Sequence, residues 1–600
     1  MTDQSGLKRF LPAIGSPAYH VMLSVVAITI LGPLGGISAA FMNFSIGFFV
    51  GGQVLAGILG SVVTLPYGPE GKHGANYMQT MAASVAGMCA MAVLIQAMVW
   101  LGLPPVPDWK MILFLTCIGM FGVGVGMLYT PVLVDRMQLT FPSGYAVANI
   151  LRALTDPALL RRSIAKLGGG MLAGYTVGFV AFKGAALGAF GAAVAAVGVS
   201  ASTVGAGFIV GARIAIPALV VALIGLAVKP HLIEIGWLAA GDPYRKIGFI
   251  ISLGTILGAA GLDITLILIE AAKRYKQQTP VAADPDWKRV NMVRLLLWIA
   301  GWGAGLVILG SQLLHQPVFF LVVALALVFV FVLVNGISLG ISDWNPISSA
   351  FVMAVFIMAA LGLKDPGVGL MCSAILLISC SVGGDMQQDR STGWRLGTNR
   401  VNQFRYQVIG IACGAVLTVV LAKVFMRAYP ILQADQFSNP HLEGAQQWQS
   451  AMTYKFVGAI KGITTSQPHV MKALWLGITI GLVTMVVRKL IKRTAGYQAF
   501  VARSGFGRAT DFTVDVVLLP SPYASSFGGF VELPTVLWWA GGGIFGSLYT
   551  SWADRRKKAA DANALPSDMS TMSLVGGGLI AGDSLAALSV GIYGLLQTVL

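Results

Sequence analysis

The chain has 600 residues, of which 56% are hydrophobic and only 11% are charged, and its net charge is +16. Because ordinary soluble domains carry about 25% charged residues, this composition excludes a soluble protein. It predicts an all-α, polytopic integral membrane protein in a lipid bilayer. The basic residues fall mostly in short connecting segments and are not interleaved with aromatic residues, so we expect no binding of nucleic acid.

The five cysteines lie inside apolar segments, and none belongs to a C-x-x-C pair. We expect them to be small buried side chains rather than disulfides or metal ligands, and we expect neither a metal site nor a cofactor. The N-terminus has a short basic lead but no small-residue cleavage site before the next polar stretch. The first apolar run is therefore predicted to be a retained helix rather than a signal peptide.

Apolar runs of about 20 residues, long enough to cross a bilayer, recur along the chain. Two shorter stretches, LTFPSGYAVANIL at 139–151 and VVLLPSPYASSFGG at 516–529, are predicted to be re-entrant or broken segments beside a cavity. In the first we place the turn at Pro142 and Gly144. With these pieces the chain is expected to hold roughly 14 to 16 transmembrane helices, and its 74 glycines predict close helix packing.

The connecting segments set the expected orientation and the domains. Basic segments are predicted to face the cytoplasm, and they cover residues 272–294, 388–405, 488–508 and 554–558. We expect an N-terminal transmembrane half at 1–275, a polar cytoplasmic linker at 276–290 and a C-terminal half at 291–600. A polar loop near 428–468 is predicted to face outward.

Short matches indicate that the two halves are pseudo-repeated. Gly36-Ile37-Ser38 recurs as Gly336-Ile337-Ser338, and Ser84-Val85-Ala86-Gly87 recurs as Ser381-Val382-Gly383-Gly384 at nearly the same offset. Each match alone could arise by chance, but their order favours a duplication, which is a common origin of transporters.

Acidic residues inside apolar runs cost about 2.5–3.5 kcal/mol on insertion scales, so they are functional candidates. Asp263 lies in GTILGAAGLDITLILIE, and its repeat partner Asp583 lies in LVGGGLIAGDSLAALSVG. A lone carboxylate such as Asp583 must be protonated, solvated or paired with another helix. Lys183 and Arg213 could pair with these acids, although long basic side chains can equally extend to the interface.

The segment SLGISDWNPIS places Asp343 and Asn345 between two apolar runs. Pro346 suits the first turn of a new helix, and either polar residue could simply cap that helix. A functional role and a capping role are both open at this point.

The segment SVGGDMQQDRSTG at 381–393 follows a strongly apolar run. Asp385 and Asp389 stand four residues apart, on one face of a helix, and two like charges this close favour retention of one proton, as a proton-coupled carrier requires. The alternative is a helix end at the cytoplasmic surface, with Asp389 paired to Arg390 or Arg395. We interpret the segment as the broken end of a helix that faces an aqueous pathway.

Five stretches, in chain order, resemble segments of the oligopeptide transporter family, which includes the yellow-stripe-like metal-chelate carriers. The stretches run through most of the chain, and they are DRMQLTFPSGYAVANIL, GLDITLILIE, SLGISDWNPIS, SVGGDMQQDRSTGW and GGGLIAGDSL. The third and fourth are similar to the family patterns G-x-T-D-x-[NS] and D-[LM]-x-Q-D-x-[KR]-T-G.

The resemblance implies a duplicated secondary transporter, not an enzyme, that imports small oligopeptides or peptide-like or metal-chelate compounds by proton symport. It also allows a homodimer. The Asn-Pro-Gly segment of the peptide branch is absent, which leaves peptide or chelate cargo open. The long acidic N-terminal tail of many eukaryotic members is also absent, and we expect a bacterial inner membrane.

We expect the cargo at the interface of the halves, between the LTFPSG and SDWNP breaks. The expected proton-coupling residues are Asp385, Asp583, Asp343, Asp389 and Asp263. The expected substrate-binding residues are Asn345, Ser143, Tyr145, Gln388 and Trp344.

Three alternatives to a transporter are an intramembrane aspartyl protease, a channel and a non-transporting membrane scaffold. The protease would need a G-x-G-D motif, and the strings before Asp385 and Asp583 lack its first glycine. A channel usually repeats one pore element across subunits. No G-x-x-x-x-G-K-[ST] string is present, so we do not expect ATP to drive transport.

Overall fold

The computed structural model describes residues 11–45, 52–184, 188–276, 285–343, 345–439, 448, 450–461, 468–530, 533–556 and 570–599. These residues form helices and no strands. Among them, nine helical segments are long and apolar enough to cross a membrane. The structure confirms the all-α, polytopic class, but it divides several of the roughly 14 to 16 expected crossings into shorter helices at prolines and glycines.

The first part of the chain contains the following elements: α2 (Pro17–Val26), π-helix η1 (Ala27–Leu31), α3 (Gly32–Ser45), α4 (Gly52–Thr64), 3₁₀-helix η2 (Leu65–Glu70), α5 (Gly71–Cys89), α6 (Ala92–Trp100), α7 (Asp108–Thr130), π-helix η3 (Pro131–Arg136), α8 (Pro142–Thr155), α9 (Pro157–Lys183), α10 (Gly188–Ala196), α11 (Ala201–Val210), α12 (Ala212–Glu234) and α13 (Arg245–Lys276).

The second part contains these elements: 3₁₀-helix η5 (Asp286–Lys288), α14 (Met292–Gln312), α15 (Val318–Ser342), α16 (Ile347–Ala360), α17 (Pro366–Leu396), α18 (Arg400–Ala428), 3₁₀-helix η6 (Pro430–Gln433), α19 (Ala451–Lys461), α20 (Pro468–Arg493), α21 (Ala495–Arg503), α22 (Gly505–Thr513), π-helix η8 (Val514–Leu518), α23 (Pro522–Phe530), α24 (Leu533–Arg556) and α25 (Thr571–Val599).

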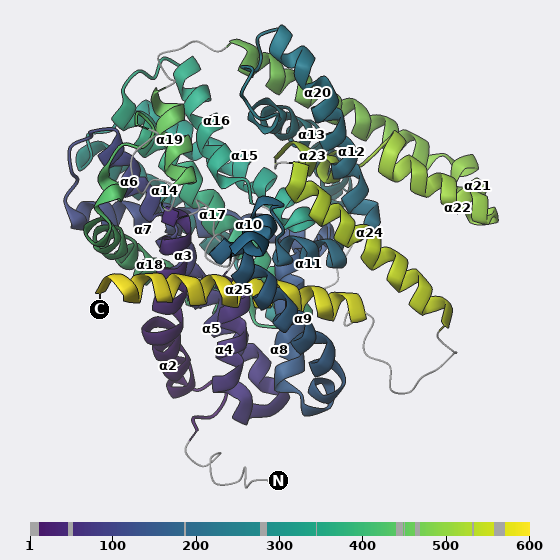
Figure 1. Ribbon diagram of the computed structural model, residues 1–600, viewed down its shortest axis with the longest axis horizontal. Helices are drawn as coiled ribbons and strands as arrows, with labels where there is room; N and C mark the ends of the chain where they lie inside the picture. The colour runs from purple at the N-terminus through teal and green to yellow at the C-terminus, as the bar shows by residue number, and fades with distance from the viewer. Residues whose placement is uncertain are drawn as a thin grey trace.

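The long helix α17 lies near the centre of the molecule (Figure 1). It packs against α5, α7, α8, α15 and α16, so it contacts helices from both predicted halves. The last helix, α25, packs against α9, α11, α8 and α3 of the first half. The hairpin of α21 and α22 projects from the body at the right of Figure 1.

Glycines bring pairs of helices into backbone contact, as the composition predicted. A Cβ atom at Gly582 of α25 would lie 2.1 Å from the carbonyl oxygen of Met171 in α9. A Cβ atom at Gly481 of α20 would lie 1.9 Å from the carbonyl oxygen of Thr255 in α13. No larger residue fits at either position without separating the helices, which is the role of small residues in membrane helix packing.

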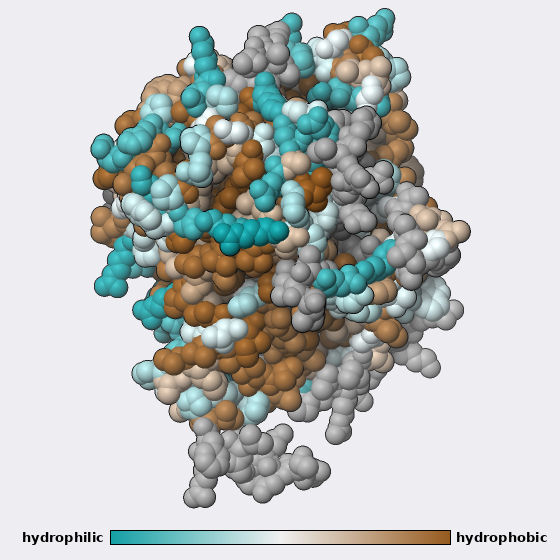
Figure 2. All heavy atoms as spheres, turned by 60° about the vertical axis from the view of Figure 1, so that its left-hand side comes forward, coloured by the Kyte–Doolittle hydropathy of each residue, from teal (hydrophilic) through white to brown (hydrophobic). Residues whose placement is uncertain are grey.

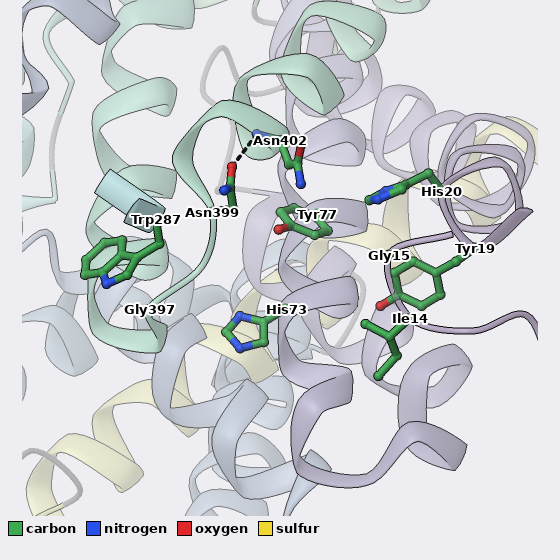
Figure 3. A pocket seen from close by; sticks show the side chains of 10 residues that line it. All are labelled: Ile14, Gly15, Tyr19, His20, His73, Tyr77, Trp287, Gly397, Asn399 and Asn402. Atoms are coloured by element: carbon green, nitrogen blue, oxygen red, sulfur yellow. Dashed lines mark hydrogen bonds between the residues drawn. The ribbon is translucent and has the colours of Figure 1, made fainter. Parts of the chain in front are cut away.

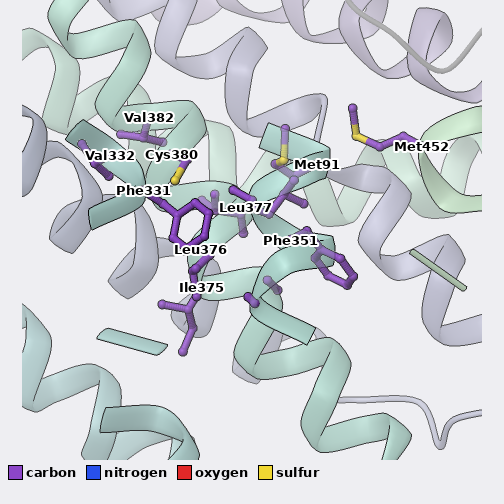
Figure 4. Close-up of a cluster of buried hydrophobic side chains, with 14 of the residues drawn as sticks. Met91, Phe331, Val332, Phe351, Ile375, Leu376, Leu377, Cys380, Val382 and Met452 are labelled. Atoms are coloured by element: carbon purple, nitrogen blue, oxygen red, sulfur yellow. The ribbon is translucent and has the colours of Figure 1, made fainter. Parts of the chain in front are cut away.

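Apolar side chains fill the interior and also cover much of the exterior. Figure 4 shows part of the core, where Phe331 of α15 and Phe351 of α16 lie near Leu376 and Leu377 of α17. On the face drawn in Figure 2, hydrophobic residues form a broad area below a more hydrophilic upper region. Helices α14 and α15 contribute strongly exposed apolar residues such as Leu297, which suits contact with lipid. Of the five cysteines, all without disulfides, four are buried.

Both predicted breaks are present. After α7 the chain forms the π-helix η3 and an irregular stretch before α8 begins at Pro142. After α22 it forms the π-helix η8 and an irregular stretch before α23 begins at Pro522. Proline suits a first helical turn because it has no N–H to satisfy there. Gly144 lies inside α8 rather than in the turn, and Phe141, with φ of 46°, makes the turn instead.

One expectation about local structure is wrong. The segment 381–393 is not a broken helix end, because α17 runs without interruption from Pro366 to Leu396. Its glycines are retained in the helix by tight packing, as a Cβ atom at Gly383 would lie 2.9 Å from Val332 of α15. The polar connection near 428–468 contains the short helix α19, whose Phe456 is buried and stacks on Phe351 at 4.2 Å, and its outward orientation remains a prediction.

The matched stretches of the proposed repeat occupy similar places. Gly36 of α3 lies against Cys89 of α5, and Gly336 of α15 lies against Gln387 of α17. The two halves and their linker remain a prediction, because residues 277–284 lie outside the described part of the chain.

Candidate functional site

The first break is closed by a carboxylate from the second half of the chain. Asp343 ends α15 in a left-handed conformation, with φ of 63°. Its Oδ1 accepts a hydrogen bond from the backbone N–H of Ser143 at 2.9 Å, and its Oδ2 accepts one from the Ser143 hydroxyl. Gln388 Nε2 donates to the same Oδ1 at 2.8 Å. Asp343, Ser143 and Gln388, all predicted as site residues, therefore meet at the N-terminus of α8.

Neither Asp343 nor Asn345 caps α16, the helix that follows them, so the capping role considered for them is wrong. The N-cap of α16 is Pro346, and it forms no side-chain cap hydrogen bond. Asn345 instead donates to the carbonyl of Cys380 in α17 at 3.1 Å and accepts from Asn335 in α15 at 3.0 Å. Asn345 thus holds α15 and α17 together, beside Gly384.

Asp385 occupies an unusual place on α17. Every residue from 369 to 393 of this helix is buried except Asp385, which keeps partial exposure. Its Oδ2 lies 2.7 Å from the position of a Cβ atom at Gly87, so the carboxylate packs against a residue of α5 that has no side chain. The two repeat-matched stretches, which end at Gly87 and Gly384, are therefore neighbours in space.

One turn further along α17, Asp389 is 1% exposed. Gln79 Nε2 of α5 donates to its Oδ1 at 2.7 Å, and its backbone carbonyl accepts from Gln403 of α18 at 2.8 Å. Asp389 interacts electrostatically with Arg390, but it is buried, so the alternative of a helix end at the cytoplasmic surface is wrong. The reason is that α17 continues past this point and buries the carboxylate between α5 and α18.

A buried polar network surrounds Asp389. Several of its side-chain atoms have no hydrogen-bonding partner within the described residues, and they belong to Asn76, Gln79, Gln387, Asp389, Arg390, Gln403 and Gln407. Buried polar atoms in proteins almost always have a partner. A concentration of this kind marks a place where water or a bound solute completes the hydrogen bonding.

A pocket of about 220 Å³ opens beside this network (Figure 3). It is lined by side chains from the start of α2, from α5, from η5 and from the junction of α17 and α18, namely Tyr19, His20, His73, Tyr77, Trp287, Asn399 and Asn402. His20 Nδ1 lies 2.8 Å from the Tyr406 hydroxyl, and Tyr77 stacks on Tyr406 at 5.0 Å. His20 is thus part of the wall of this pocket.

Tyr145, on α8 one turn from the break, lies 4.8 Å from the guanidinium of Arg395, in cation–π contact. It also lines a second pocket of about 350 Å³ that is rich in serine and threonine hydroxyls from α24 and the start of α25. The predicted site residue Trp344 lies outside the described residues.

Asp583 forms a hydrogen bond with another helix, as its position inside an apolar run predicted. Its Oδ2 accepts a hydrogen bond from the backbone N–H of Ser202 at 3.0 Å and lies 3.4 Å from the Ser200 hydroxyl, at the N-terminus of α11. Asp263 lies on α13, but its side chain is not among those described. Lys183 lies over the Tyr593 ring at 4.8 Å, and Arg213 pairs with Asp511 and Asp515 rather than with the acids proposed.

The site therefore divides into two parts. Asp343, Ser143, Gln388, Asn345 and Asp385 form one group around α8, α15 and α17, while Asp583 belongs to α25 and α11. A protease would need two carboxylates at one point, but Asp385 packs on α5 and Asp583 caps α11. Within the described residues, no three His, Cys, Asp or Glu side chains are placed to hold a metal ion.

The sequence interpretation missed Arg390 and the amides of α5 and α18. Gln79 and Gln403 stand in apolar or basic surroundings in the sequence, and nothing in their spacing indicates a site. The signal in the sequence was the large number of polar residues in SVGGDMQQDRSTG. A buried helix with so many polar side chains needs polar partners from neighbouring helices.

Comparison with known proteins supports the sequence resemblance. The family model described as "OPT oligopeptide transporter protein" matches residues 20–593. Similar curated proteins include probable metal-nicotianamine transporter YSL8 of Oryza sativa subsp. japonica, 31% identical over 114 residues, and YSL6 of Arabidopsis thaliana, 28% identical over 99 residues.

These curated matches are short. The first covers 18% of this chain and 16% of the rice protein, and the second covers 16% of this chain and 15% of the Arabidopsis protein. The family model, by contrast, extends over nearly the whole sequence, and the chain therefore belongs to the OPT oligopeptide transporter family.

Proposed function

We propose that this protein is a secondary transporter that imports small peptides or metal chelates of amino-carboxylate compounds across a bacterial inner membrane, with protons as the coupling ion. Membership of the OPT family supports transport. The observation that carries the proposal is Asp385, the one partly exposed residue within the buried stretch 369–393 of the central helix. An acid that keeps access to solvent inside a membrane bundle is typical of proton pathways.

The cargo class follows from the family and its relatives. The similar plant proteins carry the name metal-nicotianamine transporter, which favours a metal chelate over a plain peptide. Both classes present carboxylate oxygens to the protein, and peptides also present an ammonium group. The buried amides of Gln79, Gln403 and Gln407 suit such groups because an amide both donates and accepts.

Among the predicted acids, Asp385 is the best candidate for the coupling proton. Asp343 and Asp583 each accept a hydrogen bond from a helix N-terminus, at Ser143 and Ser202 respectively. Asp343 is partly exposed like Asp385, but protonation of Asp343 or Asp583 would remove an acceptor from these helix N-termini. For this reason we favour Asp385 for the exchange of a proton. We assign Asp343 and Asp583 to holding the broken helices α8 and α11 in place.

Movement of the two proposed halves against each other would expose the site alternately to the two sides. Helix α17 contacts helices of both halves, and the links at Asp343 and Asn345 join α15 to α8 and α17. A change in the protonation of Asp385 would alter the contact of α17 with α5 at Gly87.

The test is uptake by proteoliposomes of the full chain, with and without an inward proton gradient. The labelled cargo is a panel of di- to pentapeptides and of iron and nickel chelates, including nickel–nicotianamine. Asp385→Asn is compared with Asp286→Asn, which removes an exposed carboxylate at the first residue of the candidate membrane span Asp286–Gln312.

We expect gradient-driven accumulation of one cargo class by the wild-type protein and by Asp286→Asn. Asp385→Asn should lose this accumulation but keep exchange of internal for external cargo, because exchange needs no net proton movement. Full gradient-driven uptake by Asp385→Asn would remove Asp385 from the proton pathway. Accumulation that persists with a protonophore would refute proton coupling.

A further inference from the structure

Arg390 is a buried cation with most of its hydrogen-bonding capacity unused. It lies on α17 between α5 and α18, and its side chain is 1% exposed. Its Nη2 donates to Gln407 Oε1 at 3.4 Å, whereas Nε and Nη1 have no partner within the described residues. A guanidinium carries five N–H donors in a planar fork, and an uncompensated buried charge is strongly unfavourable. A purely structural arginine would be expected to use these donors.

The adjacent acid interacts electrostatically with this cation but leaves Nε and Nη1 of Arg390 without a hydrogen-bonding partner. Asp389 directs its Oδ1 to Gln79, and its Oδ2 is buried with no hydrogen bond within the described residues. The network thus contains a guanidinium with unused donors and a carboxylate with an unused acceptor on adjacent residues, a pattern complementary to a ligand with both charges.

Polar side chains link this position to the pocket of Figure 3. Tyr77 lines the pocket of Figure 3 and interacts electrostatically with Arg390. One turn deeper on α5, Thr80 accepts a hydrogen bond from Gln403 at 3.0 Å, and Gln403 follows the pocket residue Asn402 on α18. The pocket wall also holds the Tyr19 hydroxyl, which is buried and has no partner within the described residues. The polar side chains therefore continue from the pocket to Arg390.

We propose that Arg390 binds a carboxylate of the cargo and that Asp389 Oδ2 binds the ammonium group of a peptide cargo, so that the network between α5, α17 and α18 is a subsite for amino-carboxylates. In a metal chelate the amines bind the metal, and only the carboxylate contact with Arg390 applies. This inference rests on the proposed function and adds to it the chemical groups that the cargo must carry. Arginine suits this role because its fork binds a carboxylate through two parallel hydrogen bonds.

The experiment measures binding to the purified full-length protein in detergent, by the shift in its thermal unfolding midpoint at increasing ligand concentration. The probes are trialanine, its C-terminal amide, its methyl ester, its N-acetyl form and nickel–nicotianamine. The variants are Arg390→Gln, Arg390→Lys and Asp389→Asn. Arg427→Gln, an exposed arginine at the end of α18, is the matched control for loss of one positive charge.

We expect removal of the probe's carboxylate charge to weaken binding to the wild-type protein about tenfold or more, as for other charge-assisted hydrogen bonds. Arg390→Gln should weaken binding of the acid probes by a similar factor and leave binding of the amide and ester probes nearly unchanged. Asp389→Asn should reduce the distinction between trialanine and its N-acetyl form. Arg427→Gln should change none of these ratios.

Equal binding of the acid and amide forms by the wild-type protein would overturn the proposal, and so would binding of none of the probes. An equal loss of all probes in Arg390→Gln would assign Arg390 a structural role. If Arg390→Gln does not fold, Arg390→Lys takes its place, because it keeps the charge but loses the fork and should reduce the acid-to-amide ratio. Carboxylate-dependent binding without uptake would refute transport but support the subsite. Uptake without carboxylate-dependent binding would support transport but refute the subsite.

Discussion

The two breaks in the helical bundle share a sequence pattern but differ in their contacts. In the first, Val134-Asp135 precedes Pro142, and in the second, Val514-Asp515 precedes Pro522 at the same spacing. Each aspartate lies in a π-helix and pairs with an arginine from another helix, Arg400 of α18 for Asp135 and Arg488 of α20 for Asp515.

The two irregular stretches are also held in the same way. Arg395 donates to the carbonyl of Thr140 at 3.1 Å, and Arg488 donates to the carbonyl of Leu519 at 2.7 Å. Irregular backbone at membrane depth must have its polar groups satisfied by the protein or by water. In both breaks an arginine side chain meets this requirement.

The difference lies in the remaining partners. The first break receives the carboxylate of Asp343 at its helix N-terminus and lies against the polar residues of α17. In the second, Asp515 is surrounded by Arg213, Arg488 and Lys492 at the base of the α21–α22 hairpin. The same local template thus forms part of a candidate site in one case and an ionic anchor in the other, because its tertiary neighbours differ.

The largest effect is expected at the second break. Asp515→Ala leaves three cations without their shared partner, and loss of one member of a buried ion pair costs about 3–5 kcal/mol. Since the Arg213 side chain is 55% exposed and Lys492 is 31% exposed, we expect a value near the lower limit, about 3 kcal/mol. The thermal unfolding midpoint and hydrogen exchange of residues 505–530 measure it, and an effect no larger than that of Asp511→Ala would contradict the anchor.

The next effect is expected at the first break. Asp343→Ala removes the acceptor of the Ser143 N–H and hydroxyl, and unsatisfied buried donors cost about 1–3 kcal/mol. We expect a loss of about 2 kcal/mol in unfolding free energy together with a loss of uptake. Asp343→Asn keeps one acceptor oxygen and should lose less stability. If both variants keep wild-type stability, Asp343 does not hold α8.

A smaller effect is expected from the ion pair of the first break. Arg400 donates two hydrogen bonds to Asp135, at 2.7 and 2.9 Å. Asp135→Asn and Arg400→Gln should each destabilise the protein by about 1–2 kcal/mol, and the double variant should lose clearly less than the sum. Additive losses in this double-mutant cycle would show that the two side chains do not act as a pair.

The smallest effect concerns pH at the second break. Asp511 lies on α22, outside the candidate membrane spans. Partial burial alone would raise its pKa, but hydrogen bonds from Tyr497 and Lys492 and the charges of Lys492 and Arg213 outweigh burial and lower the pKa below the ordinary value. Because the pKa is lowered in the folded state, its stabilising contribution is complete well above the unfolded value near 3.9.

This contribution should therefore decrease as the pH falls below about 5 and disappear below the folded pKa. Hydrogen exchange of residues 495–513 between pH 7 and pH 4 measures the change. Asp511→Asn should remove this part of the pH dependence of hydrogen exchange. The pH dependence of hydrogen exchange at the first break should stay unchanged. Identical pH profiles for Asp511→Asn and the wild-type protein would refute the assignment.

The sequence by itself determined the solvent, the class and the positions of the breaks. A chain with 11% charged residues and repeated apolar runs can satisfy its backbone in a bilayer only as helices. Pro142 and Pro522 mark the breaks because proline cannot continue a helix from the preceding turn. The five motifs identified the family, and Asp583 was correctly expected to need a partner from another helix.

Only the tertiary structure decided which groups meet. Asp343 bonds to a residue 200 positions away, and no local pattern distinguishes this contact from a cap on the next helix. The continuity of α17 through Gly383 and Gly384 depends on packing against α15, which outweighs the low helix propensity of glycine.

The unpartnered groups of Arg390 and Asp389 likewise become visible only when α5 and α18 enclose them. In the sequence the two residues are simply neighbours of opposite charge. Only the packed helices show that both are buried and that each keeps hydrogen-bonding atoms without a partner within the described residues.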